Sequence, residues 1–272
     1  MVCLGKFDDI SKRRGRLRRS GALTQAHAAI AVRPRLDWPP HPVGRVDLRE
    51  VEPELVGPDA DPGSVAVSVF KLPRGPMPVA PEPAPGHHPG YLLLKGLVLY
   101  EVRVCGRVTA DLLGPGDHVR PYAPQDAGTL ATTATWTILE TALLGDLRAL
   151  GRLRPERSRR ILEGLLDRSA THAELLAVER TIAAQVRVDV RLLAYLWHLA
   201  DRFGVVVPGA VRLTLPLTHS VLARLVGARR PTVTTALQRL MRLGYLDRDG
   251  QAFLLLGDSS AVDELERQPP EG

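Results

Sequence analysis

The segment from Leu217 to Leu256 constrains this chain more than any other. It begins with a short run in which apolar residues recur at helical spacing, and Thr218 stands where a threonine commonly caps a helix. Gly227 interrupts the pattern, and a second amphipathic run follows over about Arg230–Leu243. Two short helices joined by a glycine-containing turn are typical of a helix-turn-helix.

A hairpin is predicted directly after the second helix. Tyr245–Asp247 and Ala252–Leu256 have the character of strands, and Asp249-Gly250 between them favours a tight turn. Such a hairpin is the wing of a winged helix. Residues 217–256 hold six Arg and two Asp, which gives a net charge of +4. Because a positive surface attracts the phosphate backbone, this segment predicts binding to double-stranded DNA.

The outward face of the second helix suits contacts with base edges and phosphates. Arginine can bind guanine and glutamine can bind adenine through paired hydrogen bonds, whereas hydroxyls and helix N-termini bind phosphates. Between Arg229 and Arg242 there is no acidic residue. A winged helix used only for protein contacts is the alternative. We expect the DNA contacts to come from Thr218, Ser220, Arg229, Arg230, Pro231, Thr232, Thr234, Thr235, Gln238, Arg239 and Gln251.

Both ends of the 272-residue chain are strongly charged. Residues 1–45 hold ten Lys or Arg against three Asp without clear periodicity, and we interpret them as a basic, flexible arm. Its cluster Lys12–Arg19 is either a solvated surface or an additional DNA contact. If that contact dominated, the chain would be a ligand-independent architectural DNA binder. Residues 258–272 hold one Arg and five acids, and predict an acidic C-terminal tail.

Residues 46–154 predict a β-rich domain. Short apolar or alternating runs are separated by turns rich in Pro and Gly, a pattern typical of a sandwich or barrel. The runs are Val65–Phe70, Tyr91–Leu94, Leu97–Val104 and Val108–Leu113.

Residues 155–203 predict two helices, and residues 204–257 complete the winged-helix domain with a hairpin at its start. From Pro155 to about Val186, apolar residues recur at helical spacing, and Val188–Phe203 forms the second pattern. A helix as long as the first can pair with its copy in a second chain. There are two alternatives to pairing. The helix packs onto its own domain, or it breaks near Ser169–Thr171 into two helices. The expected dimerisation residues are Ile161, Leu165, Leu175, Leu176, Ile182 and Val186.

Several classes of protein are disfavoured by composition. No apolar run is long enough to span a bilayer, and the basic N-terminus lacks the apolar region of a secretory signal, so we expect a cytoplasmic location and no membrane partner. Cys3 and Cys105 cannot make a disulfide framework, and Cys105 is expected to be a small core residue. In the second helix, Trp197 is expected in the core and His198 at the surface.

Enzymatic chemistry has weak support in the sequence. No nucleophile, base and acid are arranged for catalysis, so we expect no enzyme and no cofactor. The pair His87-His88 and His118 leave one alternative, a cupin-like metalloenzyme with an accessory winged helix. Cupin metal sites usually carry a His-X-His pattern, which adjacent histidines in a Pro/Gly loop do not match.

The segment Leu217–Leu240, which reads LTHSVLARLVGARRPTVTTALQRL, resembles the helix-turn-helix of the Crp/Fnr family of bacterial transcription regulators. Tyr91–Val98 and Leu112–Asp117 are similar to the family's strand-turn element and to its Pro-Gly-Asp turn. The resemblance implies an α+β chain with an N-terminal antiparallel β-roll of jelly-roll type, like a cyclic-nucleotide-binding domain. A long dimerisation helix and a C-terminal winged helix-turn-helix would follow. It implies a homodimer that regulates transcription with RNA polymerase as a partner.

The resemblance places base reading at Arg230, Pro231 and Thr235. The commonest family pattern has Arg, Glu and then Arg or Ser at these positions, and only Arg230 matches it. Proline cannot accept a hydrogen bond from a cytosine amino group as glutamate does. We therefore expect a different operator, with Arg229 sharing the readout.

The sensor part departs further from the family. Relatives that bind a cyclic nucleotide carry a Gly-Glu pair and then an Arg beside Ser or Thr after the Pro-Gly-Asp turn. Here Gly116-Asp117 is followed by His118–Tyr122, and no Arg occurs between residues 121 and 147. Because a buried phosphate needs a cationic partner, we expect no response to cyclic AMP. The four-cysteine iron–sulfur pattern is also absent. Two hypotheses remain for the function of the roll. It binds an unknown small-molecule effector, or it only supports the dimer.

Overall fold

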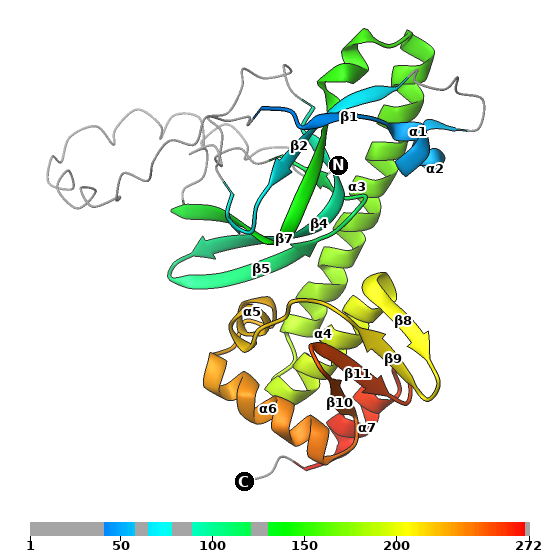
Figure 1. Cartoon of the computed structure of the whole chain (residues 1–272). Coiled ribbons are helices and arrows are strands. Elements are labelled where there is room, and N and C mark those ends of the chain that lie inside the picture. The colour runs from blue at the N-terminus through cyan, green and yellow to red at the C-terminus, as the bar shows by residue number, and fades with distance from the viewer. Residues whose placement is uncertain (1–40, 58–64, 78–88, 121–129, 270–272) are drawn as a thin grey trace, which may run out of the picture. The chain divides into compact units, whose positions relative to one another are not determined.

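The computed structural model describes residues 41–57, 65–77, 89–120 and 130–269 (Figure 1). The arginine cluster Lys12–Arg19, the pair His87-His88 and Cys3 lie outside the described residues. The last residues of the expected arm already belong to folded structure, because strand β1 begins at Gly44.

The first folded part is an antiparallel β-roll, as predicted. Its main path of strands runs β1-β2-β7-β4-β5, with β3 paired to β7 and β6 paired to β4. The elements are β1 (Gly44–Asp47), α1 (Leu48–Val51), α2 (Pro53–Val56), β2 (Ala66–Leu72), β3 (Gly75–Pro76), β4 (Tyr91–Val104), β5 (Arg107–Leu113), β6 (His118–Val119) and β7 (Thr132–Asp146).

Strand β4 joins two runs that the sequence separated, Tyr91–Leu94 and Leu97–Val104. Its pairing with β7 shifts register between Leu93 and Val98. Gly96 within this irregularity has a φ of +95°, and a Cβ there would lie 2.5 Å from the Thr141 carbonyl oxygen. Only glycine fits, because it tolerates the positive φ and leaves room for the neighbouring strand.

Two long helices follow the roll after a 3₁₀ helix over Leu147–Arg152. Helix α3 (Pro155–Ala183) is continuous through Ser169–Thr171, so the alternative of a break there is wrong. Helix α4 (Val188–Phe203) has the predicted bounds. None of the helices in the described part of the chain is long and apolar enough to cross a membrane.

Two expectations about single residues are wrong. His198 is only 8% exposed, because it faces helix α3 with its Nε2 3.6 Å from a Glu179 carboxylate oxygen. Cys105 is exposed in the turn between β4 and β5, where its φ is +49°. Trp197 is half-buried and packs against the core, as expected.

The C-terminal part contains the predicted winged helix (Figure 1). Its sheet has the order β10-β11-β9-β8, with every pair antiparallel. Helix α7 occupies part of the expected acidic tail and buries Leu265 in the core. The elements are β8 (Gly204–Val207), β9 (Ala210–Leu213), α5 (His219–Leu225), α6 (Arg230–Arg242), β10 (Leu246–Asp249), β11 (Ala252–Leu256) and α7 (Ala261–Arg267).

Candidate DNA-binding surface

Helices α5 and α6 form the helix-turn-helix through local signals in the sequence. Thr218 caps α5, since its Oγ1 accepts a hydrogen bond of 3.2 Å from the Val221 amide. Gly227 takes a φ of +62° in the turn, a conformation that favours glycine. Pro231 stands in the first turn of α6, where a missing N–H costs nothing.

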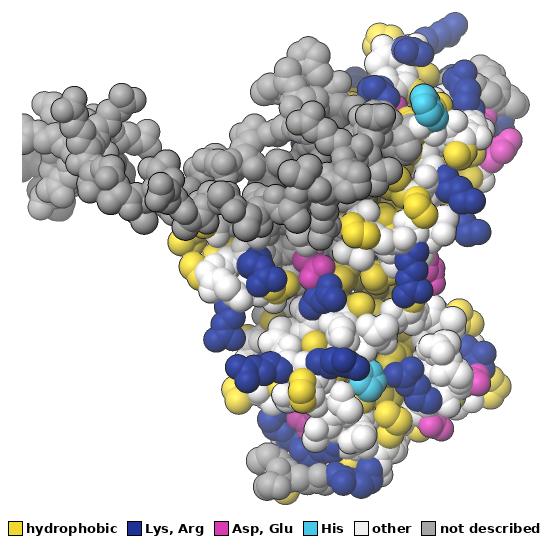
Figure 2. All heavy atoms as spheres, turned by 60° about the vertical axis from the view of Figure 1, so that its left-hand side comes forward, with side chains coloured by type: hydrophobic (Ala, Val, Ile, Leu, Met, Phe, Trp, Pro, Cys, Tyr) yellow, Lys and Arg dark blue, Asp and Glu magenta, His cyan; other side chains and the backbone are white. Residues whose placement is uncertain are grey.

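Helix α6 separates an inward and an outward face. Val233, Ala236, Leu237 and Leu240 are buried against α4, α5 and the small sheet. The opposite face is exposed and carries six of the residues expected to contact DNA: Arg229, Arg230, Pro231, Thr232, Thr235 and Gln238. The structure therefore brings these six expected residues to one surface. Figure 2 turns the α5 and α6 side forward, and dark-blue Lys and Arg side chains are prominent on it.

A contact that the sequence pattern missed holds the two helices together. His219 Nδ1 lies 2.9 Å from the Thr234 hydroxyl oxygen, and that hydroxyl also donates to the Arg230 carbonyl. Thr234 is consequently half-buried and its hydroxyl already has two partners. We infer that Thr234 fixes the angle between α5 and α6 more than it contacts DNA.

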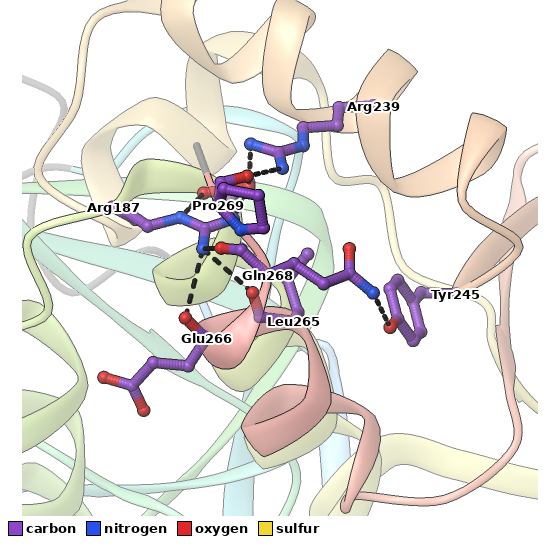
Figure 3. A network of polar contacts seen from close by, with 8 residues as sticks. Arg187, Arg239, Tyr245, Leu265, Glu266, Gln268 and Pro269 are labelled. Carbon is purple, nitrogen blue, oxygen red and sulfur yellow. Dashed lines mark hydrogen bonds and ion pairs between the residues drawn. The ribbon is translucent and has the colours of Figure 1, made fainter. Parts of the chain in front are cut away.

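Arg239 lies elsewhere than expected. Its side chain is only 13% exposed and pairs with Asp189, with Nη1 2.9 Å from the carboxylate oxygen Oδ2. Its Nη2 donates to the Pro269 carbonyl oxygen at 3.0 Å (Figure 3). The expected DNA contact from Arg239 thus needs correction, because the residue stands at the edge of the inward face.

The wing adds a cation that the sequence pattern did not single out. Arg248 on β10 lies over the Phe253 ring, with 3.9 Å between the guanidinium carbon and the ring centroid. Burial lowers the pKa of Arg248, which still leaves it charged at neutral pH. An ion pair between Arg212 and Asp249 ties the wing to β9. Gln251, expected to contact DNA, is exposed in the wing turn.

We predict that Thr218→Ala lowers the free energy of unfolding of the winged helix by about 1 kcal/mol. The alanine removes the hydroxyl that satisfies the Val221 amide at the start of α5. Urea unfolding measures the change. Thr218→Ser retains the hydroxyl and serves as the control. Equal stability of the two variants would contradict the capping role.

A cavity of about 640 Å³ lies between the roll, α3 and α5. The rings of Tyr100 and Trp136, 4.2 Å apart between centroids, form part of its wall. Asp111, His172 and Glu179 contribute polar groups to its lining. Within the described residues, no three His, Cys, Asp or Glu side chains are grouped to hold a metal ion.

An ion pair in this cavity joins α3 to the roll. His172 Nε2 lies 2.9 Å from the Asp111 carboxylate oxygen Oδ2. The hydrogen bond that His172 donates to the Asp111 carboxylate raises the pKa of His172, against the effect of burial, and the charges of Asp111 and nearby Asp117 act in the same direction. The stability gained from this pair is fully present below the ordinary histidine pKa and is lost as the pH rises through the raised pKa.

We therefore predict that His172→Gln destabilises the protein by about 1 kcal/mol near pH 6 and by less above pH 8. Urea unfolding at a series of pH values measures the difference from the wild type. Asp111→Asn should remove the same pH-dependent part. A difference that stays constant from pH 6 to 9 would show that the charge on His172 does not contribute.

The expected dimerisation residues do not share one face of α3. Ile161 and Leu165 are buried in the chain's own roll against Leu48 and Leu55, so they are not available to a second chain. Ile182 packs against the core around α4, and Leu175 is half-buried. Leu176 is exposed, whereas the exposed Val186 lies in the turn after the helix.

Another face of α3 carries exposed apolar residues. Leu162, Leu166 and Leu176 are 48%, 69% and 41% exposed. With Ser169 and Ala173 they stand at alternating intervals of four and three residues, which is the spacing of a coiled-coil seam. We call these five residues the exposed stripe of α3. Of the expected dimerisation residues, only Leu176 belongs to this stripe.

In a comparison with known protein families, residues 190–260 match the model of the family described as "Crp-like helix-turn-helix domain". Residues 190–260 are thus similar to Crp-like helix-turn-helix domains. This Crp-like domain comprises nearly all of α4 and the winged helix up to the residue before α7.

Longer stretches of the chain also have relatives. It is 33% identical over 150 residues to a CRP-like cAMP-activated global transcriptional regulator of Mycobacterium tuberculosis. That match covers 53% of this chain and 64% of the relative. The chain thus spans somewhat less than two thirds of the length of the curated relatives that it matches.

Solved structures show the same fold beyond the Crp-like domain. A mutant of CooA from Carboxydothermus hydrogenoformans has a TM-score of 0.54 at 18% identity, over 79% of this chain and 94% of that one. CLP, a c-di-GMP responsive global regulator of Xanthomonas campestris, has a TM-score of 0.53 at 19% identity, over 70% and 94%. The predicted resemblance to Crp/Fnr proteins and the predicted α+β fold are confirmed.

Proposed function

We propose that this protein is a sequence-specific DNA-binding transcription regulator that acts as a homodimer. One observation carries the proposal. The outward face of α6 presents Arg229, Arg230, Thr235 and Gln238 without a carboxylate, on a Crp-like domain. In a helix-turn-helix, the second helix enters the major groove and reads base edges with its N-terminal residues. The regulator would act by contacting RNA polymerase or by blocking its access.

The homodimer is supported by the exposed stripe of α3. Leucine side chains that are 41–69% exposed, spaced for a coiled coil, favour pairing with a second copy of the helix. Two copies related by a twofold axis would present two α6 helices to successive major grooves.

Selection of bound sequences from random double-stranded DNA tests the function. We expect enrichment of a pseudo-palindrome whose half-sites lie about one helical turn apart. Its half-sites should differ from the familiar family pattern because Pro231 replaces the glutamate. Failure to enrich any sequence would contradict DNA reading, and enrichment of single half-sites would contradict the dimer.

The cavity between the roll and α3 supports a small-molecule effector, and the sequence argues against cyclic AMP. The relative from Mycobacterium tuberculosis is described as cAMP-activated. In this chain no Arg stands between residues 121 and 147, where the resemblance places the phosphate partner. Thermal unfolding with excess cyclic AMP should show no shift of Tm. A rise in Tm would contradict this part of the proposal, because a ligand that binds only the folded state stabilises it.

A further inference from the structure

The segment Leu265–Pro269 is tied to helix α6 by a network of polar contacts (Figure 3). The network consists of Arg187 and Asp189 at the start of α4, Arg239 on α6, and the carbonyl groups of Leu265, Glu266, Gln268 and Pro269. We call it the Asp189 network. It joins three segments that lie far apart in the sequence.

Asp189 is the centre of this network. Its Oδ2 lies 2.7 Å from Arg187 Nη2 and 2.9 Å from Arg239 Nη1. Burial alone would raise the pKa of Asp189, but hydrogen bonds from Arg187 and from the Val190 amide, with the charges of both arginines, hold that pKa below its usual range. Asp189 is therefore ionised when the protein is folded at neutral pH, and it can hold two cations at once.

Arg187 connects the centre to the end of helix α7. Its Nη1 donates to the carbonyl oxygens of Leu265 at 2.9 Å, Glu266 at 3.3 Å and Gln268 at 2.5 Å. The last carbonyls of a helix have no partner within the helix and carry the negative end of its dipole. The Arg187 guanidinium provides hydrogen bonds to these carbonyl groups. In addition, the side-chain amide of Gln268 donates a hydrogen bond of 2.9 Å to the Tyr245 hydroxyl.

Arg239 brings α6 into the same network. Its guanidinium is directed away from the outward face, toward Asp189 and the Pro269 carbonyl. An apolar side chain would also fill this position, but it would specify the rotation of α6 less strictly than a directional ion pair does. Because α6 is one rigid helix, the rotation fixed at Arg239 also sets the direction of Arg230 and Thr235.

We infer that Asp189 and Arg239 are positioning residues for DNA reading, and that Leu265–Pro269 is part of the same device. This inference rests on the proposed function, and it assigns a role to a segment that the sequence indicated only as an acidic tail. The network fixes α6 so that its exposed residues meet the base edges at one angle. It makes no contact with DNA.

Binding of the full chain to its selected site and to random DNA, at several salt concentrations, tests the inference. Arg239→Met keeps an unbranched, flexible side chain at this position and leaves Asp189 paired with Arg187, so we expect the fold to be retained. We expect the preference for the selected site to fall about tenfold, with an unchanged dependence of the logarithm of affinity on the logarithm of salt concentration. Asp189→Asn should cause a similar loss although it removes no positive charge.

Three results would overturn the inference. If Arg239 contacted a phosphate, Arg239→Met would weaken binding to all sequences and reduce the salt slope by about one, and Asp189→Asn would have no effect. An unchanged preference in Arg239→Met would also overturn it. Asp201→Asn, an exposed aspartate on the same helix α4, is the matched control and should leave the preference unchanged. A wild type that selects no DNA would overturn both this inference and the proposed function.

Discussion

Arg230→Ala is expected to remove most of the preference for the selected DNA site. Arg230 is exposed at the first position of α6, where a guanidinium can take guanine O6 and N7 together. Loss of one such bidentate contact costs about 1–3 kcal/mol, which corresponds to a loss of discrimination of roughly 5- to 150-fold. Affinity for random DNA should fall much less. It depends on the summed attraction of many positive charges to the phosphates, and Arg230→Ala removes only one of them.

Competition binding with the selected site and a scrambled site measures this effect. Arg159→Ala provides the matched control, since Arg159 is an arginine 77% exposed on α3, paired only weakly with Glu163. The control should retain the preference of the wild type. Equal losses on the selected and the scrambled site in Arg230→Ala would assign Arg230 to the phosphate backbone and leave Arg229 as the reader.

The double variant Leu162→Glu/Leu166→Glu is expected to convert the protein to a monomer. Both leucines belong to the exposed stripe of α3, and two like charges facing their copies across a twofold axis would oppose pairing. Two linked half-site contacts bind far more tightly than one. We therefore expect affinity for the full site to fall by about 100-fold or more.

Sedimentation at micromolar concentration and footprinting on the full site measure the two effects. Val178→Glu is the control, because Val178 is 47% exposed on the opposite side of the same helix. That variant should remain dimeric and protect both half-sites. A double variant that still sediments as a dimer would locate the interface on another surface.

The local elements were predictable because their signals are contained in short windows. The cap at Thr218, the turn at Gly227 and the apolar periodicity of α6 each act over one or two helical turns. Helix α4 also had its predicted bounds. The candidate surface on α6 follows from the same periodicity, since the residues between its buried positions must face outward.

The errors lie where partners come from distant parts of the chain. Helix α3 has apolar residues on two faces, and only the folded roll shows that Ile161 and Leu165 are covered by their own chain. Periodicity predicts an apolar face but does not say which domain covers it. The prediction that His198 lies at the surface was wrong for the same reason. Its partner, Glu179, stands on the neighbouring helix α3, and periodicity within α4 does not reveal that contact.

The sequence by itself determined the winged helix from Leu217 to Leu256 and the outward direction of Arg230, because helix periodicity and capping are local properties. Only the tertiary structure decided which arginine of α6 turns inward. Arg239 stands at the edge of the apolar face, and both directions are open to a long, flexible side chain. Its partners, Asp189 and the Pro269 carbonyl, come from the start of α4 and the end of the chain. These partners come close to Arg239 only once the chain has folded.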